Sequence, residues 1–268
     1  MNLVDAVTQL GLRIAPGLAV QGFYRLEHHQ GQPSIMALDR VVRPNDVVVD
    51  VGAHRGVYTW RLAQLTGLNG HVHAFEPNPP GLRVLRAATT GAYNVTTYPI
   101  ALSDTTGTGR LMRPIADGRR VDAMSSLSPA GIRSDVESDY VMVRLDTLDS
   151  VLASETRRIS FIKIDVEGHE HEVLVGAAER LHRDMPTLLI EIEQRHRDRP
   201  VSETFDFLLG LGYVGSVLAR DRERPLADFD VQADQLAYLG DGFERGRPDP
   251  AYITDFLFKR LKAGPQRA

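Results

Sequence analysis

The chain of 268 residues contains no cysteine, which excludes disulfide bridges, thiolate zinc sites and cysteine nucleophiles. It also lacks any apolar run close to the ~20 residues that a helix needs to cross a bilayer. Polar residues and a proline interrupt the apolar residues between Leu3 and Leu18, which is unlike a secretory signal peptide. We therefore expect a cytoplasmic protein with no transmembrane segment.

An excess of either charge is absent as well. The 31 basic residues nearly balance the 35 acidic ones, giving a formal net charge of −4, so no electrostatic footprint for nucleic acid is present. The hydrophobic content of 43% and the charged content of 25% are ordinary for a globular protein. The length suits one large α/β domain with attached segments.

Strand and helix patterns alternate through most of the chain. Strands are predicted at 47–51, 71–75, 95–102, 141–145, 161–165 and 188–192, and helices at 57–65, 80–89, 148–153, 172–182 and 205–211. This alternation predicts an α/β fold with a parallel sheet covered by helices on both faces. Two final apolar segments, 236–239 and 252–258, predict an antiparallel C-terminal edge, and we expect seven strands in the sheet.

Two segments stand outside this alternation. Residues 3–10 and 17–28 read as short amphipathic helices, so we expect residues 1–40 to form a helical cap before a main domain at 41–268. Residues 105–140 are rich in glycine, serine, arginine and aspartate. A long irregular segment within a compact domain is usually a lid or a binding insertion, and we expect this one to lie over the site of the second substrate.

The pattern Asp50-x-Gly52-x-x-x-Gly56 follows the first strand, and Glu76 ends the second. A strand, a glycine turn, a helix and a second strand ending in a carboxylate are typical of a nucleoside-cofactor site. A dinucleotide site wants the glycine-richer G-x-G-x-x-G, whereas Ala53 follows Gly52 here. The pattern is instead that of methyltransferases that use S-adenosylmethionine.

In such a site each acid has a role. Asp50 would lie near the positively charged methionine end, while Gly52 allows the chain to pass tightly around it. Glu76 would accept hydrogen bonds from both ribose hydroxyls. The alternative is that both acids merely cap the helices that follow them. Two acids with a glycine pair between them favour the cofactor.

The third strand ends at Ser103 and Asp104, where the order of the sheet predicts the adenine. Asp104 is a candidate acceptor for the adenine amino group, and a turn-forming aspartate is the alternative. The predicted cofactor-binding residues are Asp50, Gly52, Ala53, Gly56, Glu76, Pro77, Asn78, Ser103 and Asp104.

The chain resembles the FkbM-type methyltransferases in several motifs. The most specific is Ile162-Lys163-Ile164-Asp165-Val166-Glu167-Gly168-His169-Glu170, and segments 49–56, 75–78, 101–104 and 145–149 add to it. The resemblance implies a class I methyltransferase (Rossmann-like) fold and O-methylation of hydroxyls on sugars, glycans, polyketides or other secondary metabolites. The family usually has asparagine where this chain has His54. Ser125-Ser126-Leu127 resembles a family segment expected near the methionine end or the acceptor.

Methyl transfer to an alcohol needs a base or a metal ion that lowers the hydroxyl pKa. The catalytic candidates Asp165, Glu167 and His169 follow the strand predicted at 161–165. His169 could act as a base, although a histidine that starts a helix is often a capping residue. His171 and His196 are further histidines placed near this region.

A magnesium site is one reading of the acids in this region. Asp165 could face Glu193 across strands about 4.8 Å apart, and Glu191 points the same way as Glu193. Carboxylate oxygens with retained waters suit Mg²⁺. The alternative is that these acids line a polar cleft without metal.

Two other functions remain open from the sequence: a nicotinamide-dependent oxidoreductase and a non-catalytic cofactor-binding protein. Ala53 speaks against the first, and the acids at both strand ends speak against the second. The expected partner is a small molecule or glycan that offers a hydroxyl. The sequence gives no prediction of oligomeric state.

Overall fold

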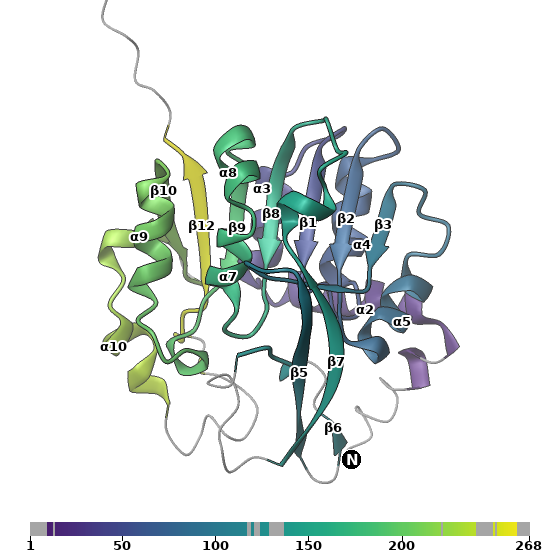
Figure 1. Ribbon diagram of the computed structural model, residues 1–268, viewed down its shortest axis with the longest axis horizontal. Helices are drawn as coiled ribbons and strands as arrows, with labels where there is room; N and C mark the ends of the chain where they lie inside the picture. The colour runs from purple at the N-terminus through teal and green to yellow at the C-terminus, as the bar shows by residue number, and fades with distance from the viewer. Residues whose placement is uncertain are drawn as a thin grey trace, which may run out of the picture.

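An eight-stranded sheet forms the centre of the molecule, with strand order β11-β10-β12-β9-β8-β1-β2-β3 (Figure 1). This computed structural model describes residues 10–12, 14–116, 119–120, 124–128, 137–220, 222–239, 249 and 251–261. The strands are β1 (Val47–Val51), β2 (His71–Phe75), β3 (Val95–Tyr98), β8 (Ile159–Ile164), β9 (Thr187–Glu191), β10 (Tyr213–Leu218), β11 (Glu223–Pro225) and β12 (Asp255–Arg260).

Five adjacent strands, from β9 to β3, run parallel, and β12 lies antiparallel to both β9 and β10. All five residues of β1 are buried. Val49 and Val51 pack into a core on one side of the sheet, and Val48 packs into a core on the other. Burial on both faces explains why the central strands read as continuous apolar runs.

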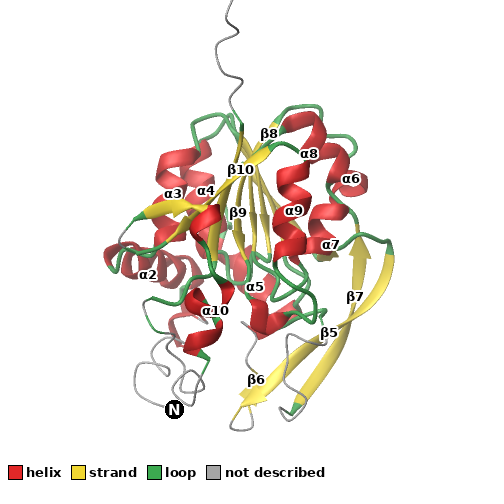
Figure 2. Ribbon diagram, turned by 90° about the vertical axis from the view of Figure 1, so that its left-hand side faces the viewer, coloured by secondary structure: helices red, strands yellow, loops and turns green. Residues whose placement is uncertain are grey.

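Helices cover both faces of this sheet, as Figure 2 shows. One face carries α2 (Pro16–His29), α3 (Pro33–Val41) and α4 (Val57–Thr66), and the other carries α6 (Leu148–Val151), α7 (Glu170–Val175), α8 (Ala178–Asp184) and α9 (Ser202–Gly210). The described elements also include α5 (Pro79–Ala88), α10 (Val231–Asp234) and the 3₁₀ turns η3 (Gln194–His196), η4 (Leu226–Asp228) and η5 (Leu236–Tyr238). Prolines begin α2, α3 and α5, since the first helical N–H needs no partner within the helix.

A second sheet, β4-β7-β5-β6, projects from the carboxyl-end side of the first (Figures 1 and 2). It contains β4 (Ile100–Leu102), β5 (Gly107–Ala116), β6 (Arg119–Arg120) and β7 (Ser138–Asp146). We call β5 to β7 the arm. The prediction of an irregular segment at 105–140 is thus wrong for the described residues, because β5 pairs antiparallel with β7 over eight residue pairs.

The predicted α/β fold, with a mostly parallel sheet and an antiparallel C-terminal edge, is confirmed. The sheet has eight strands rather than seven because β11 adds a three-residue edge strand. The strand predicted at 95–102 is two strands in different sheets, separated at Pro99, which has no N–H for a ladder. The helix predicted at 172–182 is divided at Gly176, where a Cβ atom would lie 1.9 Å from the Ser103 carbonyl oxygen.

The predicted C-terminal strand pair is half right. Segment 236–239 contains the turn η5, and β10 pairs with β12 in its place. The helix predicted at 17–28 is confirmed by α2, whereas residues 3–9 of the one predicted at 3–10 lie outside the described residues. The division into a cap at 1–40 and a domain at 41–268 stays a prediction. Within the described ranges, no helix has the length and apolar character to span a membrane.

Candidate active site

A cavity of about 240 Å³ opens at the carboxyl ends of β1, β2 and β8, and we call it the β1 cavity. It contains six of the predicted site residues: Gly52, Glu76, Pro77, Asp165, Glu167 and His169. The other lining residues are Val51, His54, Phe75, Ile100, Ala101, Leu102, Leu111, Ser125, Leu127 and Val166. Residues far apart in the sequence therefore line one cavity, and the arm, through Leu111 of β5, forms one side of it.

The turn after β1 requires glycine at position 52. Gly52 has φ +76°, and a Cβ atom there would lie 1.8 Å from the carbonyl oxygen of Asp165. The N–H groups of Gly52 and Ala53 both donate to the Phe75 carbonyl oxygen, at 3.0 and 2.9 Å. The turn thus passes tightly between the ends of β2 and β8.

His54 also adopts a left-handed backbone conformation, with φ +48°. Asparagine and histidine are enriched among non-glycine residues in that region, so the difference from the family's usual asparagine leaves the turn intact. Gly56, with φ +90°, precedes α4, and a Cβ atom there would lie 2.7 Å from Leu85 Cδ1. The second glycine serves packing against α5 rather than lining the cavity.

The Glu76 carboxylate is held by two backbone N–H groups. Oε2 accepts from His54 at 2.6 Å and Oε1 accepts from Asn78 at 2.7 Å. Burial raises the pKa of Glu76 to about 7, against the effect of these two bonds. Each carboxylate oxygen has a further lone pair, so the group can still accept hydrogen bonds from a diol in the cavity.

Asp50 lies beneath the turn and outside the cavity lining. Its side chain is fully buried, and its Oδ2 accepts from Thr59 Oγ1 at 2.5 Å. Lys163 Nζ lies 3.9 Å from the other oxygen, Oδ1. The influence of Asp50 on the cavity is therefore electrostatic: its charge adds to the rise in the pKa of Glu76.

Lys163 is the residue whose role the sequence did not reveal. Its Nζ lies 3.1 Å from Asp165 Oδ2, 3.4 Å from the Gly52 carbonyl oxygen and 4.7 Å from the centre of the Tyr58 ring. Burial alone would lower the Lys163 pKa, but the carboxylates of Asp165 and Asp50 outweigh it and raise that pKa. The sequence did contain a signal for this role: Lys163 is the one charged residue within the buried strand β8 and lies two residues before Asp165.

His169 is hydrogen-bonded through one ring nitrogen and lies close to a carboxylate at the other. Ser103 Oγ lies 2.9 Å from Nε2, and Glu172 Oε2 lies 3.6 Å from Nδ1. Burial lowers the pKa of His169. Ser103 Oγ also donates to Asp104 Oδ1 at 3.1 Å. Neither Ser103 nor Asp104 is among the lining residues, so their contact with adenine stays a prediction.

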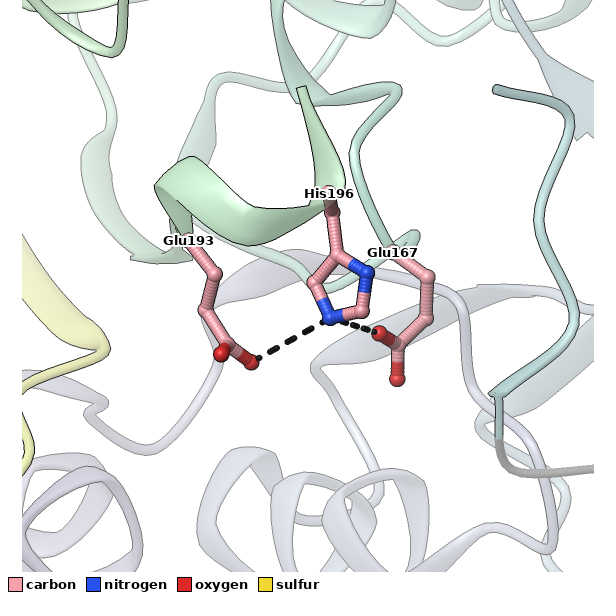
Figure 3. Close-up of side chains that lie close together, drawn as sticks. All are labelled: Glu167, Glu193 and His196. Carbon is pink, nitrogen blue, oxygen red and sulfur yellow. Dashed lines mark ion pairs between the residues drawn. The ribbon is translucent and has the colours of Figure 1, made fainter. Parts of the chain in front are cut away.

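Three side chains converge at the wall of the cavity: Glu167, Glu193 and His196 (Figure 3), which we call the Glu–His–Glu cluster. His196 Nε2 lies 3.0 Å from Glu167 Oε2 and 3.6 Å from Glu193 Oε1. Burial, reinforced by the charge of Asp165, raises the pKa of Glu167 to about 8. Burial alone would lower the His196 pKa, but Glu193 and Glu167 reverse the effect and raise it.

Glu193 differs sharply from Glu167. Arg195 donates to both of its oxygens, at 2.5 and 3.0 Å, and the Tyr252 hydroxyl donates at 2.5 Å. Although burial would raise the Glu193 pKa, the bonds from His196 and Arg195 lower it to about 2. One carboxyl of the cluster is therefore fixed as an anion, and the other exchanges its proton near neutral pH.

The potential ligand atoms of the Glu–His–Glu cluster lie within 4.8 Å of one another. This set shares only Glu193 with the predicted magnesium ligands. Of the other two, Asp165 pairs with Lys163, and Glu191 lines a second cavity of about 680 Å³ beside the end of β9, which we call the β9 cavity. Glu193 lines this second cavity too, so the cluster forms part of the wall between the two hollows.

The model of the FkbM methyltransferase domain matches residues 50–214. The chain belongs to the FkbM methyltransferase family. The 31-O-demethyl-FK506 methyltransferase FkbM of Streptomyces tacrolimicus is 29% identical over 198 residues, which are 65% of this chain and 74% of that protein. The match to the family model begins at Asp50 and includes the residues at the carboxyl ends of β1, β2 and β8 that form the β1 cavity. This favours the methyltransferase prediction over the nicotinamide oxidoreductase.

Solved structures with a similar fold include methyltransferase FkbM from Methylobacillus flagellatus, with 16% identity and a TM-score of 0.48. That match covers 95% of this chain but only 58% of the longer protein. Fibrillarin from Aeropyrum pernix, in complex with S-adenosyl-L-methionine, has 10% identity and a TM-score of 0.44, with 81% of this chain and 67% of that one covered.

The FkbM family is S-adenosylmethionine-dependent, and the β1 cavity fits this cofactor. The Gly52 turn leaves no room for a Cβ atom, Glu76 presents a carboxylate with spare acceptor capacity, and most of the lining is apolar, as an adenine ring requires. Glycine turn, carboxylate and apolar lining are the three features that such a nucleoside needs.

Proposed function

We propose that this chain transfers the methyl group of S-adenosylmethionine to a hydroxyl of a sugar, glycan, glycolipid or other secondary metabolite. The observation that carries the proposal is Glu167, a carboxyl that lines the β1 cavity while His196 holds it beside Glu193 of the β9 cavity. O-methylation is also in the name of the Streptomyces relative.

Bound S-adenosylmethionine supplies a methyl group activated by a sulfonium. In the proposed role, Gly52 and Ala53 form the turn that encloses the cofactor, and Glu76 accepts from its ribose hydroxyls. Gly56 seats α4, while Pro77 and Asn78 continue the wall; Asn78 Nδ2 donates to Ser125 Oγ at 3.2 Å and so ties this wall to the segment that follows β6. The Asp165 carboxylate favours a positive charge nearby.

Three side chains in the cavity could accept the hydroxyl proton. Asp165 is paired with Lys163 at 3.1 Å, so one of its oxygens is already engaged by a cation. His169 Nε2 is already hydrogen-bonded to Ser103, and burial lowers the pKa of this histidine. Glu167 has a raised pKa of about 8, close to the value at which a general base is most effective near neutral pH. We therefore assign the role of general base to Glu167, whereas Asp165 and His169 form part of the cavity wall.

S-Adenosylhomocysteine (SAH), the product form of the cofactor, provides the first test. We expect wild-type protein to bind it in isothermal titration, and Glu76→Gln to weaken binding by about 10- to 150-fold, since a hydrogen bond to a charged group contributes ~1.5–3 kcal/mol. Glu203→Gln, at a surface ion pair with Arg199, is the matched control. Absence of binding by the wild type would reject the proposal. A methyl mass gain on hydroxylated acceptors then establishes the reaction.

Magnesium assistance through Asp165, Glu191 and Glu193 is the second candidate for hydroxyl activation. The chain's own cations, Lys163 and Arg195, already neutralise two of these acids, and the imidazole of the Glu–His–Glu cluster suits transition metals better than Mg²⁺. We therefore expect turnover to be unchanged by EDTA. A loss of turnover in EDTA that added Mg²⁺ restores would favour the metal instead.

A further inference from the structure

The β9 cavity lies between the end of β9, the start of β12 and the hairpin of β10 and β11. Its volume of about 680 Å³ is in the range of small-molecule sites. Such sites are mostly apolar, but only five of its eighteen lining residues are: Pro33, Leu218, Ala219, Ala251 and Ile253. A cavity of this size with a polar lining suits a polar ligand.

Two carboxyls stand side by side in this cavity. Glu191 and Asp255 are direct partners in the antiparallel pair of β9 and β12, an arrangement that places side chains on the same face about 5 Å apart. Burial, with the charge of Asp165 added, raises the pKa of Glu191 and raises that of Asp255 to about 7.

Glu191 ends β9 with a partly exposed side chain that lines the β9 cavity. Asp255 interacts with the Ser34 hydroxyl, which leaves it further acceptor capacity. The pair is thus a ready acceptor for two neighbouring donors of a ligand.

The charges around the cavity select among ligands. Four arginines line it together with the acids, and two of them, Arg195 and Arg224, are ion-paired with Glu193 and Asp234 of the same lining; the other two are Arg220 and Arg222. An ammonium-bearing ligand would meet the arginines, and an anionic ligand would meet Glu191 and Asp255. Neutral hydroxyls can donate to carboxylates and accept from guanidinium groups, so a neutral polyol satisfies both.

We propose that the β9 cavity is the acceptor site and takes a neutral saccharide, with Glu191 and Asp255 accepting hydrogen bonds from neighbouring hydroxyls. This inference rests on the proposed methyl transfer. Glu193 lines the β9 cavity and Glu167 lines the β1 cavity, with His196 between them, so the two cavities adjoin at the Glu–His–Glu cluster.

Saturation-transfer NMR with a panel of methyl hexosides, in the presence of SAH, tests the site. We expect wild-type protein to give saccharide signals, Glu191→Leu to weaken them about tenfold, and Glu191→Gln, which keeps an acceptor oxygen, to retain more. The affinity for SAH should be unchanged in both variants, which also shows that they are folded. Glu203→Leu, on the surface of α9, is the control.

The outcomes separate the two proposals. If the wild type does not bind SAH, the methyltransferase proposal fails. If SAH binds but no hexoside signal appears, or the signals persist in Glu191→Leu, only the saccharide site is wrong. A preference for an amino-hexoside or for an apolar macrolactone over neutral hexosides would likewise overturn the assignment of a neutral saccharide.

Discussion

Gly52→Ala is expected to reduce SAH affinity by about 100-fold or more. The substitution would place Cβ 1.8 Å from the carbonyl oxygen of Asp165, and this oxygen belongs to the backbone after β8 and cannot rotate away. The left-handed φ adds ~1–2 kcal/mol of strain. Relief requires the turn to move, which breaks the bonds from Gly52 and Ala53 to Phe75, each contributing ~1 kcal/mol.

Gly91→Ala is the matched control for Gly52→Ala. Gly91 has φ +85°, and nothing lies within 4 Å of the Cβ position, so this variant carries the backbone strain without the clash. We expect its SAH affinity to equal that of the wild type and its melting temperature to fall by only a few degrees. Equal SAH affinities for Gly52→Ala and wild type would show that the cofactor does not contact this turn.

Glu167→Gln is expected to lower kcat by about 10²–10⁴-fold, the usual contribution of a general base. Glutamine has nearly the shape of the neutral carboxyl that prevails in Glu167 below its pKa of about 8. The fold and the affinity for SAH should therefore be retained. The acceptor KM should change little, since the lost interaction is one made as the proton moves.

The pH dependence gives this prediction a second measurement. A base must be ionised, so wild-type kcat should rise with pH and level off above the Glu167 pKa of about 8, whereas the residual kcat of Glu167→Gln should lack this rise. Glu203→Gln should keep the wild-type profile. A wild-type profile with no rise between pH 6 and 9, or full activity in Glu167→Gln, would assign the base elsewhere.

The central sheet was predictable because the composition of each of its main strands is typical of a buried strand. β1 and β8 are runs of β-branched and apolar residues whose two faces are both buried, and such runs have few other uses. β5 gave no such signal, since it contains two glycines, two arginines and a proline. The strand conformation of β5 is stabilised by its pairing with β7 and not by its own composition.

Gly176 illustrates a boundary that no local pattern reveals. Apolar spacing continues from Val173 to Leu181, which predicts one helix, yet the chain divides there to let the Ser103 carbonyl approach closely. The contact joins residues 73 positions apart, so it exists only once the fold is formed. Tertiary contact overrides helix propensity at this point.

The residues of the site also fall into those that local sequence predicts and those that depend on tertiary contacts. Gly52 and Glu76 were predictable because a turn and a strand end constrain residues within a few positions of one another. Lys163, Tyr252 and Asp255 were not, since their roles depend on carboxylates brought close by the antiparallel strand β12 and by the approach of β8 to β1. Residues that bind a common cofactor are thus easier to find than residues that complete a network.

The arm leaves and rejoins the main fold at one place. Leu102 at the end of β4 is the ladder partner of Asp146 at the end of β7, and the Ser103 N–H donates to the Asp146 carbonyl oxygen at 2.9 Å. The residues between Leu102 and Asp146 therefore form an insertion whose two ends lie side by side. Such an insertion can lengthen or shorten without changing the register of the eight central strands. Grafting an arm between two members of the family would exchange one wall of the β1 cavity while the cofactor turn and its glycine stay in place.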